Sequence, residues 1–161
     1  MRILGIDPGS RRTGWGIVDH QRAQSVYVAS GTLALGEGDE LSQRLLRLAS
    51  GLEAIISEHR PEHCAVERIF SARNAHSALV LGHARGVILL TAARLNLALH
   101  EYAATEVKRA VVGAGRASKD QVNKMVGVLL NRREPYQEDE SDALAVALTH
   151  AVFNALAEKT K

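Results

Sequence analysis

The stretch that decides the fold is Ile3-Leu4-Gly5-Ile6-Asp7-Pro8-Gly9-Ser10. Its apolar run is typical of a buried strand, and Pro8-Gly9 is a turn signal that ends this strand directly after Asp7. A carboxylate within an apolar sheet is costly unless it is paired or binds a metal ion. The pattern therefore predicts that Asp7 lies at the open end of a central strand.

The remaining elements follow from the change of apolar period along the chain. Strands are expected at residues 14–19, 25–35, 64–66 and 97–102. Helices are expected at residues 40–60, 74–95, 105–112, 118–130 and 139–158. Asp39 is the expected N-cap of the first helix, Pro61 follows its end, and Ser118 and Gln121 form a capping box at the fourth helix.

This order of elements predicts an α/β fold in which a five-stranded mixed sheet carries helices on both faces. The second strand is expected antiparallel to the first, and the fourth and fifth parallel to it. The 161 residues, of which 46% are hydrophobic and 24% charged, fit one domain over residues 1–161 with frayed last residues.

The sequence favours a cytoplasmic protein without a membrane segment. Charged Arg2 follows Met1 at once, and the longest apolar run, residues 87–93, is far shorter than the roughly 20 residues that span a bilayer. The single cysteine, Cys64, builds no disulfide framework and is expected to be a small buried hydrophobe.

Four carboxylates carry the chemical hypothesis. Glu67 ends an apolar strand as Asp7 does, and Asp139 and Asp142 share one face at the start of the last helix. Four converging acids repel one another unless cations lie between them, and oxygen ligands favour Mg²⁺ or Mn²⁺. Two such ions about 4 Å apart can activate water and stabilise the leaving oxygen of a phosphodiester.

Each acid also has a structural interpretation. Asp7 is a turn former beside Pro8, Glu67 a solvated residue at a strand end, and the acids of residues 138–142 are favoured by the helix dipole. Glu138 and Glu140 can compete with Asp139 and Asp142 for a cation. The metal hypothesis is favoured because all three structural interpretations would have to hold together.

Basic residues gather just before these acids. The net charge is only +2, but residues 108–133 hold a single acid, Asp120, against Lys108, Arg109, Arg116, Lys119, Lys124, Arg132 and Arg133. This segment is either a phosphate-binding surface beside a cation site or a solvated helix face. Lys119 directly follows the N-cap Ser118, and a helix N-terminus with a lysine is suited to bind phosphate.

Several motifs resemble those of the RuvC family of Holliday-junction resolvases. They are Gly5-Ile6-Asp7-Pro8-Gly9-Ser10, Thr13-Gly14-Trp15-Gly16, Val66-Glu67-Arg68-Ile69-Phe70, Gly82-His83-Ala84-Arg85-Gly86, Lys119-Asp120-Gln121-Val122 and Asp139-Glu140-Ser141-Asp142. The motifs occur in the family's order over residues 3–150, which is nearly the whole chain.

The resemblance implies an RNase H-like fold and a homodimer that cuts four-way DNA junctions with paired nicks in strands of like polarity. It implies Mg²⁺ or Mn²⁺, two ions per site, with water as the nucleophile, and RuvA and RuvB as partners. By position, the catalytic and metal-binding acids are Asp7, Glu67, Asp139 and Asp142. The implied DNA-binding residues are Phe70, Arg73, Asn74, Lys108 and Lys119.

Some residues keep two interpretations. Phe70 is either a core residue or an aromatic that stacks on a base. Gly82 and Gly86, about one helical turn apart, permit close helix contact at a dimer interface or inside the fold. Arg68 is expected to point away from Glu67. For His150, a hydrogen-bonded helix histidine is favoured over a proton shuttle.

Other functions are possible from the sequence. Asp7-Pro8-Gly9-Ser10 also resembles the phosphate loop of actin-like ATPases and sugar kinases, which need two such domains to enclose a nucleotide. An RNase H-like nuclease acting on RNA, or a junction-binding protein without cleavage, is the stronger alternative.

Overall fold

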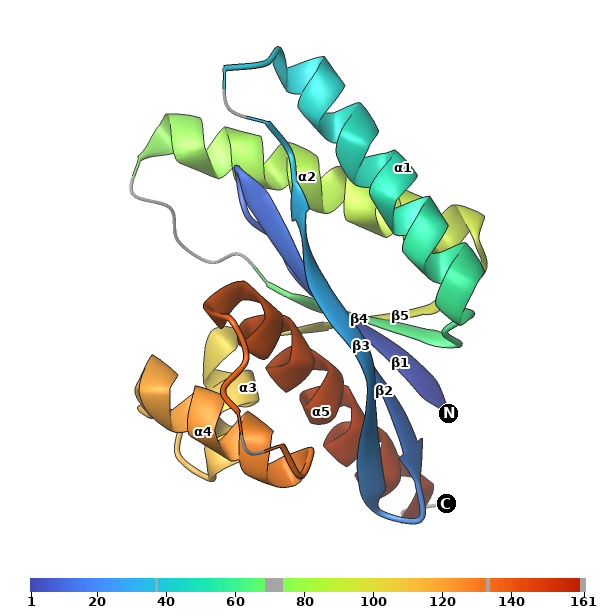
Figure 1. The fold of residues 1–161 in the computed structure, drawn as a ribbon, viewed down its shortest axis with the longest axis vertical. Coiled ribbons are helices and arrows are strands. Elements are labelled where there is room, and N and C mark those ends of the chain that lie inside the picture. The colour runs from blue at the N-terminus through green and yellow to red at the C-terminus, as the bar shows by residue number, and fades with distance from the viewer. Residues whose placement is uncertain (37, 69–73, 133, 160–161) are drawn as a thin grey trace.

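The computed structural model describes residues 1–36, 38–68, 74–132 and 134–159. Five strands in this part of the chain form one sheet in the order β3-β2-β1-β4-β5 (Figure 1). The strands are β1 (Arg2–Asp7), β2 (Arg12–Gln21), β3 (Gln24–Ala34), β4 (His63–Glu67) and β5 (Ala98–Tyr102). The helices are α1 (Leu41–His59), α2 (Ala75–Arg94), α3 (Ala104–Val112), α4 (Lys119–Leu129) and α5 (Glu138–Lys159).

The strand directions confirm the predicted mixed sheet. β1 pairs antiparallel with β2, with Asp7 opposite Gly14, and β2 continues antiparallel into β3. β1 pairs in parallel with β4, with Ile6 beside Val66, and β4 pairs in parallel with β5. The ends of β1 and β4 therefore lie at the same edge of the sheet.

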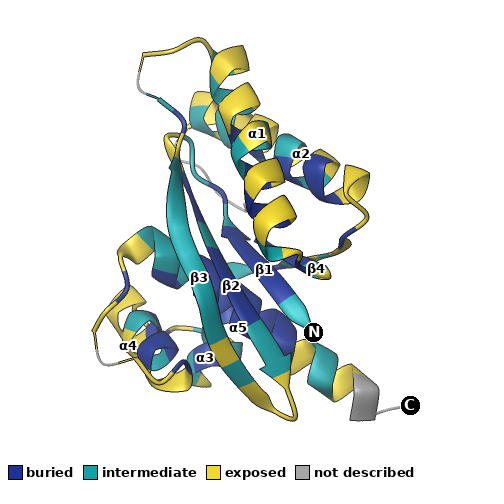
Figure 2. Ribbon diagram, turned by 45° about the vertical axis from the view of Figure 1, so that its right-hand side comes forward, coloured by how far each residue is buried: buried dark blue, intermediate teal, exposed yellow. Residues whose placement is uncertain are grey.

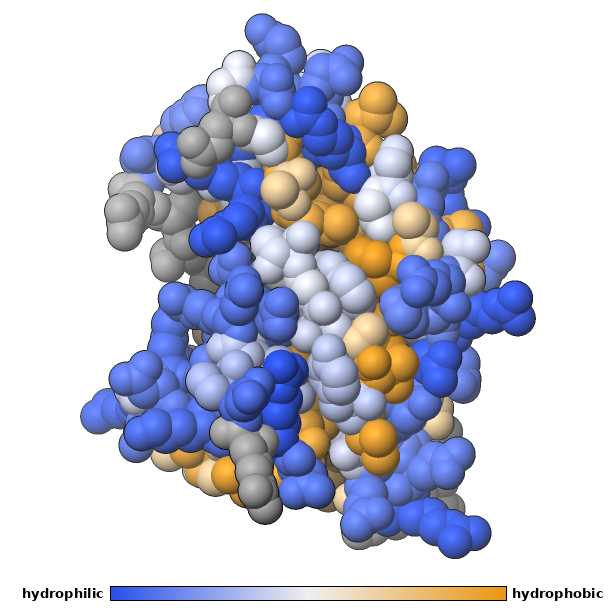
Figure 3. Space-filling view, in the orientation of Figure 1, coloured by the Kyte–Doolittle hydropathy of each residue, from blue (hydrophilic) through white to orange (hydrophobic). Residues whose placement is uncertain are grey.

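The sheet separates two helical layers with a core on each side (Figure 1). On β1, Leu4 and Ile6 pack with α1 and α2, whereas Ile3 packs with α3, α4 and α5. This alternation follows from the period of two in a strand, and β1 lies buried in the middle of the sheet (Figure 2). Figure 3 shows that hydrophobic surface lies mostly near the middle of one face, with hydrophilic side chains around it.

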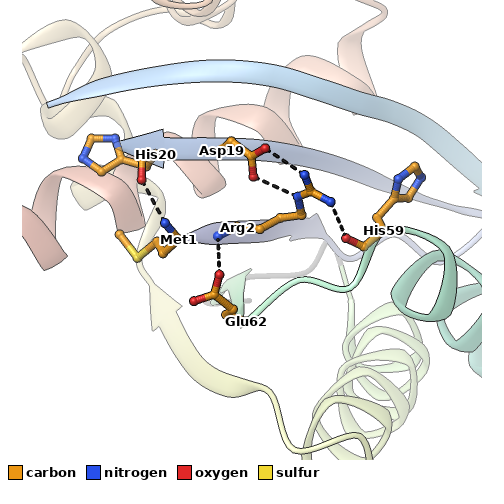
Figure 4. A network of polar contacts seen from close by, with 6 residues as sticks. All are labelled: Met1, Arg2, Asp19, His20, His59 and Glu62. Carbon is orange, nitrogen blue, oxygen red and sulfur yellow. Dashed lines mark hydrogen bonds and ion pairs between the residues drawn. The ribbon is translucent and has the colours of Figure 1, made fainter. Parts of the chain in front are cut away.

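A polar network anchors the beginning of β1 (Figure 4). The Arg2 guanidinium donates two hydrogen bonds of 2.8 Å to the Asp19 carboxylate on β2 and one of 2.7 Å to the His59 carbonyl at the end of α1. The N-terminal ammonium of Met1 donates to the His20 carbonyl at 3.0 Å. These contacts tie the first strand to its neighbour and to α1, at the end of β1 opposite to Asp7.

Helix α5 packs unusually close to the sheet because three glycines leave room for it. A Cβ atom at Gly5 would lie 2.1 Å from the Ala143 carbonyl oxygen, and one at Gly14 would lie 2.0 Å from the Asp139 carbonyl oxygen. At Gly16 a Cβ atom would meet the Leu144 side chain at 2.6 Å. Such separations are far below van der Waals contact, so the helix can take this position only against glycine.

Most local sequence expectations hold, with one correction. Ser118 and Gln121 form the predicted capping box, and Cys64 is a free, buried cysteine. Asp39 was wrongly expected to cap α1, because the N-cap is Glu40 and makes no side-chain cap hydrogen bond. Asp39 instead forms an ion pair with Arg47, which also reaches the carbonyl of Leu35.

Among the described residues one helix, α2, is long and apolar enough to cross a membrane by length and composition alone. In the fold 22% of its most apolar window is buried, and Ala84, Ile88 and Ala92 pack in the core with residues of α1 and the sheet. Its hydropathy is therefore explained in part by packing within the domain.

We expect Gly14→Ala to destabilise the protein by about 1–3 kcal/mol, the usual cost of overpacking, since the new methyl group would push the start of α5 off the sheet. Denaturant unfolding measures this change. Gly115→Ala is the control: its Cβ would meet no atom closer than 3.5 Å, so its effect should stay within about 0.5 kcal/mol. Equal midpoints for the two variants would contradict the close-packing argument.

Candidate active site

Two carboxylates emerge side by side at the end of the sheet. Asp7 is the last residue of β1 and Glu67 the last of β4, and these strands are paired in parallel up to Ile6 and Val66. Ile3 and Ala65 face the α5 layer, so strand alternation places Asp7 and Glu67 on that same face. The sheet register alone therefore directs both acids toward α5.

Helix α5 brings a third acid to this edge. Asp142, on the first turns of α5, lines the same cleft as Asp7 and Glu67. The cleft has a volume of about 230 Å³, and its other lining residues are Ala104, Val107, Lys108, Lys119, Val122 and Ala145. Its wall thus combines three acids with two lysines over an apolar floor.

The two lysines come from the two short helices beside α5. Lys119 is the first residue of α4, and its Nζ donates to Glu138 Oε1 at 2.6 Å and to Asp142 Oδ2 at 3.1 Å. Lys108, on α3, lines the same cleft, and its charge lowers the pKa of Glu67 against the effects that raise it. Both predicted basic residues therefore lie at the carboxylates, and Lys119 bridges two acids of α5.

Asp139 lies beside the cleft instead of lining it. Its carbonyl oxygen is the atom packed against Gly14, and its carboxylate forms an ion pair with Arg12 at 3.3 Å. Arg12 was not singled out from the sequence. The signal that could have found it is the antiparallel pairing of β2 with β1, which returns Arg12 to the edge where Asp7 ends.

The two glutamates expected to compete for a cation are engaged elsewhere or at the rim. Glu140 accepts a hydrogen bond of 3.0 Å from the Ser30 hydroxyl on β3. Glu138 is paired with Lys119, and both side chains are about two-thirds exposed. Among the acids of residues 138–142, Asp142 is therefore the one directed into the cleft.

The acids in the cleft are electrostatically strained without a cation. Burial, followed by the carboxylates of Glu67 and Asp142, raises the pKa of Asp7 to about 8. Burial and then Asp142 also raise the pKa of Glu67, against the opposing effect of Lys119 and Lys108. Ionised forms of both side chains are disfavoured here by desolvation and by like charge.

This donor set fits a hard divalent cation. A cation between the acids would reverse the repulsion that raises the pKa of Asp7, and carboxylate oxygens are ligands that Mg²⁺ and Mn²⁺ prefer. The ammonium group of Lys119 already lies between Glu138 and Asp142, which shows that the rim of the cleft accommodates positive charge.

The remaining predicted residues are placed as follows. Phe70 and Arg73 lie outside the described residues. Asn74 is the N-cap of α2, where its Oδ1 accepts from Ser77 N at 2.9 Å. Arg68 donates to the Glu101 carbonyl at 3.0 Å. His150 is buried and hydrogen-bonded through both ring nitrogens, as favoured for a structural histidine.

The chain has the RNase H-like fold of a resolvase nuclease. In this fold an antiparallel meander is extended by two parallel strands, helices cover both faces, and acids lie at the strand ends. The family model "Crossover junction endodeoxyribonuclease RuvC" matches residues 3–150. The chain therefore belongs to the RuvC family of crossover junction endodeoxyribonucleases.

Relatives and solved structures agree with this assignment. The RuvC of Xanthomonas euvesicatoria is 52% identical, over 98% of this chain and 91% of the relative, and that of Citrifermentans bemidjiense is 50% identical over 94% and 92%. A structure of Thermus thermophilus RuvC in complex with Holliday junction substrate matches with a TM-score of 0.92 and 31% identity, covering 98% of this chain and 96% of that one. The yeast mitochondrial resolvase Ydc2, at 14% identity and a TM-score of 0.70, shares the fold.

The raised pKa of Asp7 gives a prediction for the metal-free protein. Between about pH 4 and 8 the folded state holds a proton that the unfolded state has lost, so stability should fall as the pH rises. Asp7→Asn removes this titration. In EDTA at pH 8 we expect the variant to be at least about 1 kcal/mol more stable than the wild type, a rise in Tm of about 2–4 °C.

Thermal unfolding at pH 5 and pH 8 tests this expectation. The matched control is Asp19→Asn, because Arg2 lowers the pKa of Asp19 and stabilises its ionised form. That stability is present at neutral pH and lost in acid, so the control should lower Tm at pH 8. A difference between Asp7→Asn and wild type that does not grow with pH would show that Asp7 is not buried beside other acids.

Proposed function

We propose that this chain resolves four-way DNA junctions by hydrolysing phosphodiester bonds at the carboxylate cleft, with paired nicks in strands of like polarity. The observation that carries the proposal is the convergence of Asp7, Glu67 and Asp142 beside Lys108 and Lys119. Membership in the RuvC family and the likeness to a RuvC bound to a Holliday junction support the same substrate. The matches give no support to an RNA substrate or to binding without cleavage.

In this proposal Asp7, Glu67 and Asp142 would hold the divalent ions. Asp139 would add a fourth carboxylate after its ion pair with Arg12 is broken on ligand binding. When bound, Mg²⁺ or Mn²⁺, two ions per site, would lower the pKa of a water molecule and stabilise charge on the phosphodiester. The protein positions Asp7, Glu67 and Asp142 on two adjacent strands and one helix, so these three carboxylates are already together before a substrate binds.

Lys119 is proposed to move from carboxylate to phosphate when DNA binds. Its ion pair with Glu138 is solvent-exposed, and exposed pairs contribute only about 0–1 kcal/mol. The N-terminus of α4, capped by Ser118, directs backbone N–H groups toward the same place. Lys108 faces the cleft from α3, so a phosphate would lie between two ammonium groups.

Cleavage of a labelled four-way junction, beside a linear duplex and an RNA–DNA hybrid, tests the function. We expect paired nicks in the junction with Mg²⁺ and none with EDTA. Glu67→Gln should reduce the cleavage rate by about 1,000-fold, because several kcal/mol of charge stabilisation are lost, and should leave junction binding within a few-fold of the wild type.

Glu53→Gln is the matched control, since it makes the same chemical change on α1, where Glu53 forms only a 3.7 Å ion pair with Arg94. This variant should cleave at the wild-type rate. Cutting of the RNA–DNA hybrid with the junction left intact would replace the proposed substrate. Full activity of Glu67→Gln would remove Glu67 from the site.

We also propose a homodimer formed by the outer face of α2. Leu79 and Leu90 are 64% and 60% exposed, and with Gly86 they fall within about 40° of one another around the helix. A Cβ atom at Gly82 or Gly86 would meet nothing within 4 Å, so packing against the described part of the chain does not account for these glycines. Small residues between exposed leucines suit close contact with a second copy of this helix.

Leu90→Glu is expected to convert the dimer into a monomer, measured by sedimentation. An unpaired charge buried in an apolar interface costs about 3–5 kcal/mol, which corresponds to at least about a 100-fold weaker dimer. Leu46→Glu on α1 is the control, since Leu46 is 59% exposed and lies outside the proposed interface. A Leu90→Glu protein that stays dimeric would move the interface elsewhere.

We further propose, from family membership, that the protein acts in the cytoplasm. The same membership supports the branch-migration proteins RuvA and RuvB as its partners.

A further inference from the structure

A cluster of three histidines lies on the face of the sheet that carries the active site, away from the carboxylates. His63 begins β4, His100 lies in β5 and His150 lies in the second half of α5. One ligand atom from each lies within 4.8 Å of the other two. Among the described residues, these three histidines form a group whose potential ligand atoms are close enough together to share one metal ion.

The placement of the cluster follows from the same register as the active site. His63 and Glu67 are four residues apart on β4 and share a face, and Asp142 and His150 are eight residues apart on α5. Four strand residues span about 13 Å and eight helical residues about 12 Å. The histidines therefore meet roughly 12–13 Å from the acids, where α5 crosses the opposite part of the sheet.

We propose that His63, His100 and His150 bind a divalent transition-metal ion of intermediate hardness, with Zn²⁺ as the expected ion, at a site separate from the carboxylate cleft. Neutral imidazoles are preferred ligands of such ions, whereas Mg²⁺ prefers oxygen. Three histidines leave a fourth, tetrahedral position for water, and the exposed ring of His100 gives the ion access from solvent.

The geometry needs a change of tautomer and a small adjustment of distance. His150 Nε2 and His63 Nδ1 are hydrogen-bonded at 2.9 Å, so the ion would take the place of the shared proton, which moves to the other nitrogen of its ring. The separation is close to the value of about 3.3 Å between two nitrogen ligands of tetrahedral zinc. The His100 ring is stacked on His150, with centroids 4.2 Å apart, so it must turn its lone pair toward the ion. Because His100 is exposed, this rotation meets little packing resistance.

The surroundings of His150 suit a ligand. Its Nδ1 is hydrogen-bonded to the Tyr102 hydroxyl at 2.7 Å, an outer contact that holds the ring with Nε2 directed at His63, so that an ion would replace the hydrogen bond between these two rings. Burial, then His100 and His63, lower the pKa of His150 to about 4, and burial also lowers the pKa of His100. Both rings are therefore neutral at neutral pH, as metal ligation requires.

An ion at this site would join β4, β5 and α5. Since α5 also carries Asp142, the ion would fasten the far part of the helix whose beginning forms the active site. Occupancy is thus expected to stabilise the folded protein without supplying a group to the cleavage reaction.

Titration of the untagged protein with CoCl₂ and ZnCl₂, in excess MgCl₂ to fill the carboxylate site, tests the proposal. We expect one Co²⁺ per chain with the visible absorption of tetrahedral cobalt, its displacement by Zn²⁺, and a higher Tm with Zn²⁺. His100→Gln should weaken Zn²⁺ binding at least tenfold and leave Mg²⁺-dependent junction cleavage unchanged. We expect this variant to fold, because the side chain of His100 is exposed and its replacement leaves the core unchanged.

His76→Gln, at an exposed histidine outside the cluster, is the control and should bind Zn²⁺ as the wild type does. Equal Zn²⁺ affinity in His100→Gln and the wild type would overturn the proposal, as would loss of binding in His76→Gln alone. Retention of the cobalt spectrum in Asp7→Asn is expected, because the two sites are separate; its loss in that variant would assign the ion to the carboxylate cleft instead.

Discussion

The close contact between α5 and the sheet is the constraint on which the rest of the structure depends. At Gly5 and Gly14 the helix backbone occupies the space that a side chain would take, and Gly16 accommodates Leu144 in the same way. A single methyl group at Gly14 would meet the carbonyl oxygen of Asp139. The glycines of β1 and β2 therefore determine how near the acids of α5 come to the acids that end β1 and β4.

That closeness has an electrostatic consequence. Asp7 and Glu67 are partly desolvated and lie near the carboxylate of Asp142, so their ionised forms are unfavourable in the protein alone. The fold thus carries a local instability that a proton on Asp7 or a bound cation relieves, and Lys108 in the middle of α3 and Lys119 at the start of α4 supply part of the positive charge. A partly buried cluster of acids that destabilises the chain is expected where these acids bind metal ions and a phosphodiester.

Much of this site could be predicted because it rests on local patterns. An apolar run ending in an acid before a turn places Asp7, the same pattern places Glu67, and the capping box places Lys119 at a helix N-terminus. Which acid of residues 138–142 enters the cleft could not be predicted from the sequence with certainty. Four carboxylates, Glu138, Asp139, Glu140 and Asp142, lie within five positions and have the same chemistry. The tertiary structure decides it: Arg12 pairs with Asp139, Ser30 donates to Glu140, and Lys119 bonds both Glu138 at the exposed rim and Asp142, which lines the cleft. The predicted N-cap of α1 was wrong for a related reason: Asp39 forms an ion pair with Arg47 instead of capping the helix.

By itself, the sequence determined the order and type of the elements, the strand-end acids and the family, because hydrophobic period, turn residues and motifs act over a few neighbouring positions. Only the tertiary structure decided what meets across long separations. His63 and His150 lie 87 residues apart and are hydrogen-bonded at 2.9 Å, and Ser30 and Glu140 meet across 110 residues. Such contacts depend on sheet register and on the depth at which α5 packs, which are set by the shape of the whole core and not by any one stretch of residues.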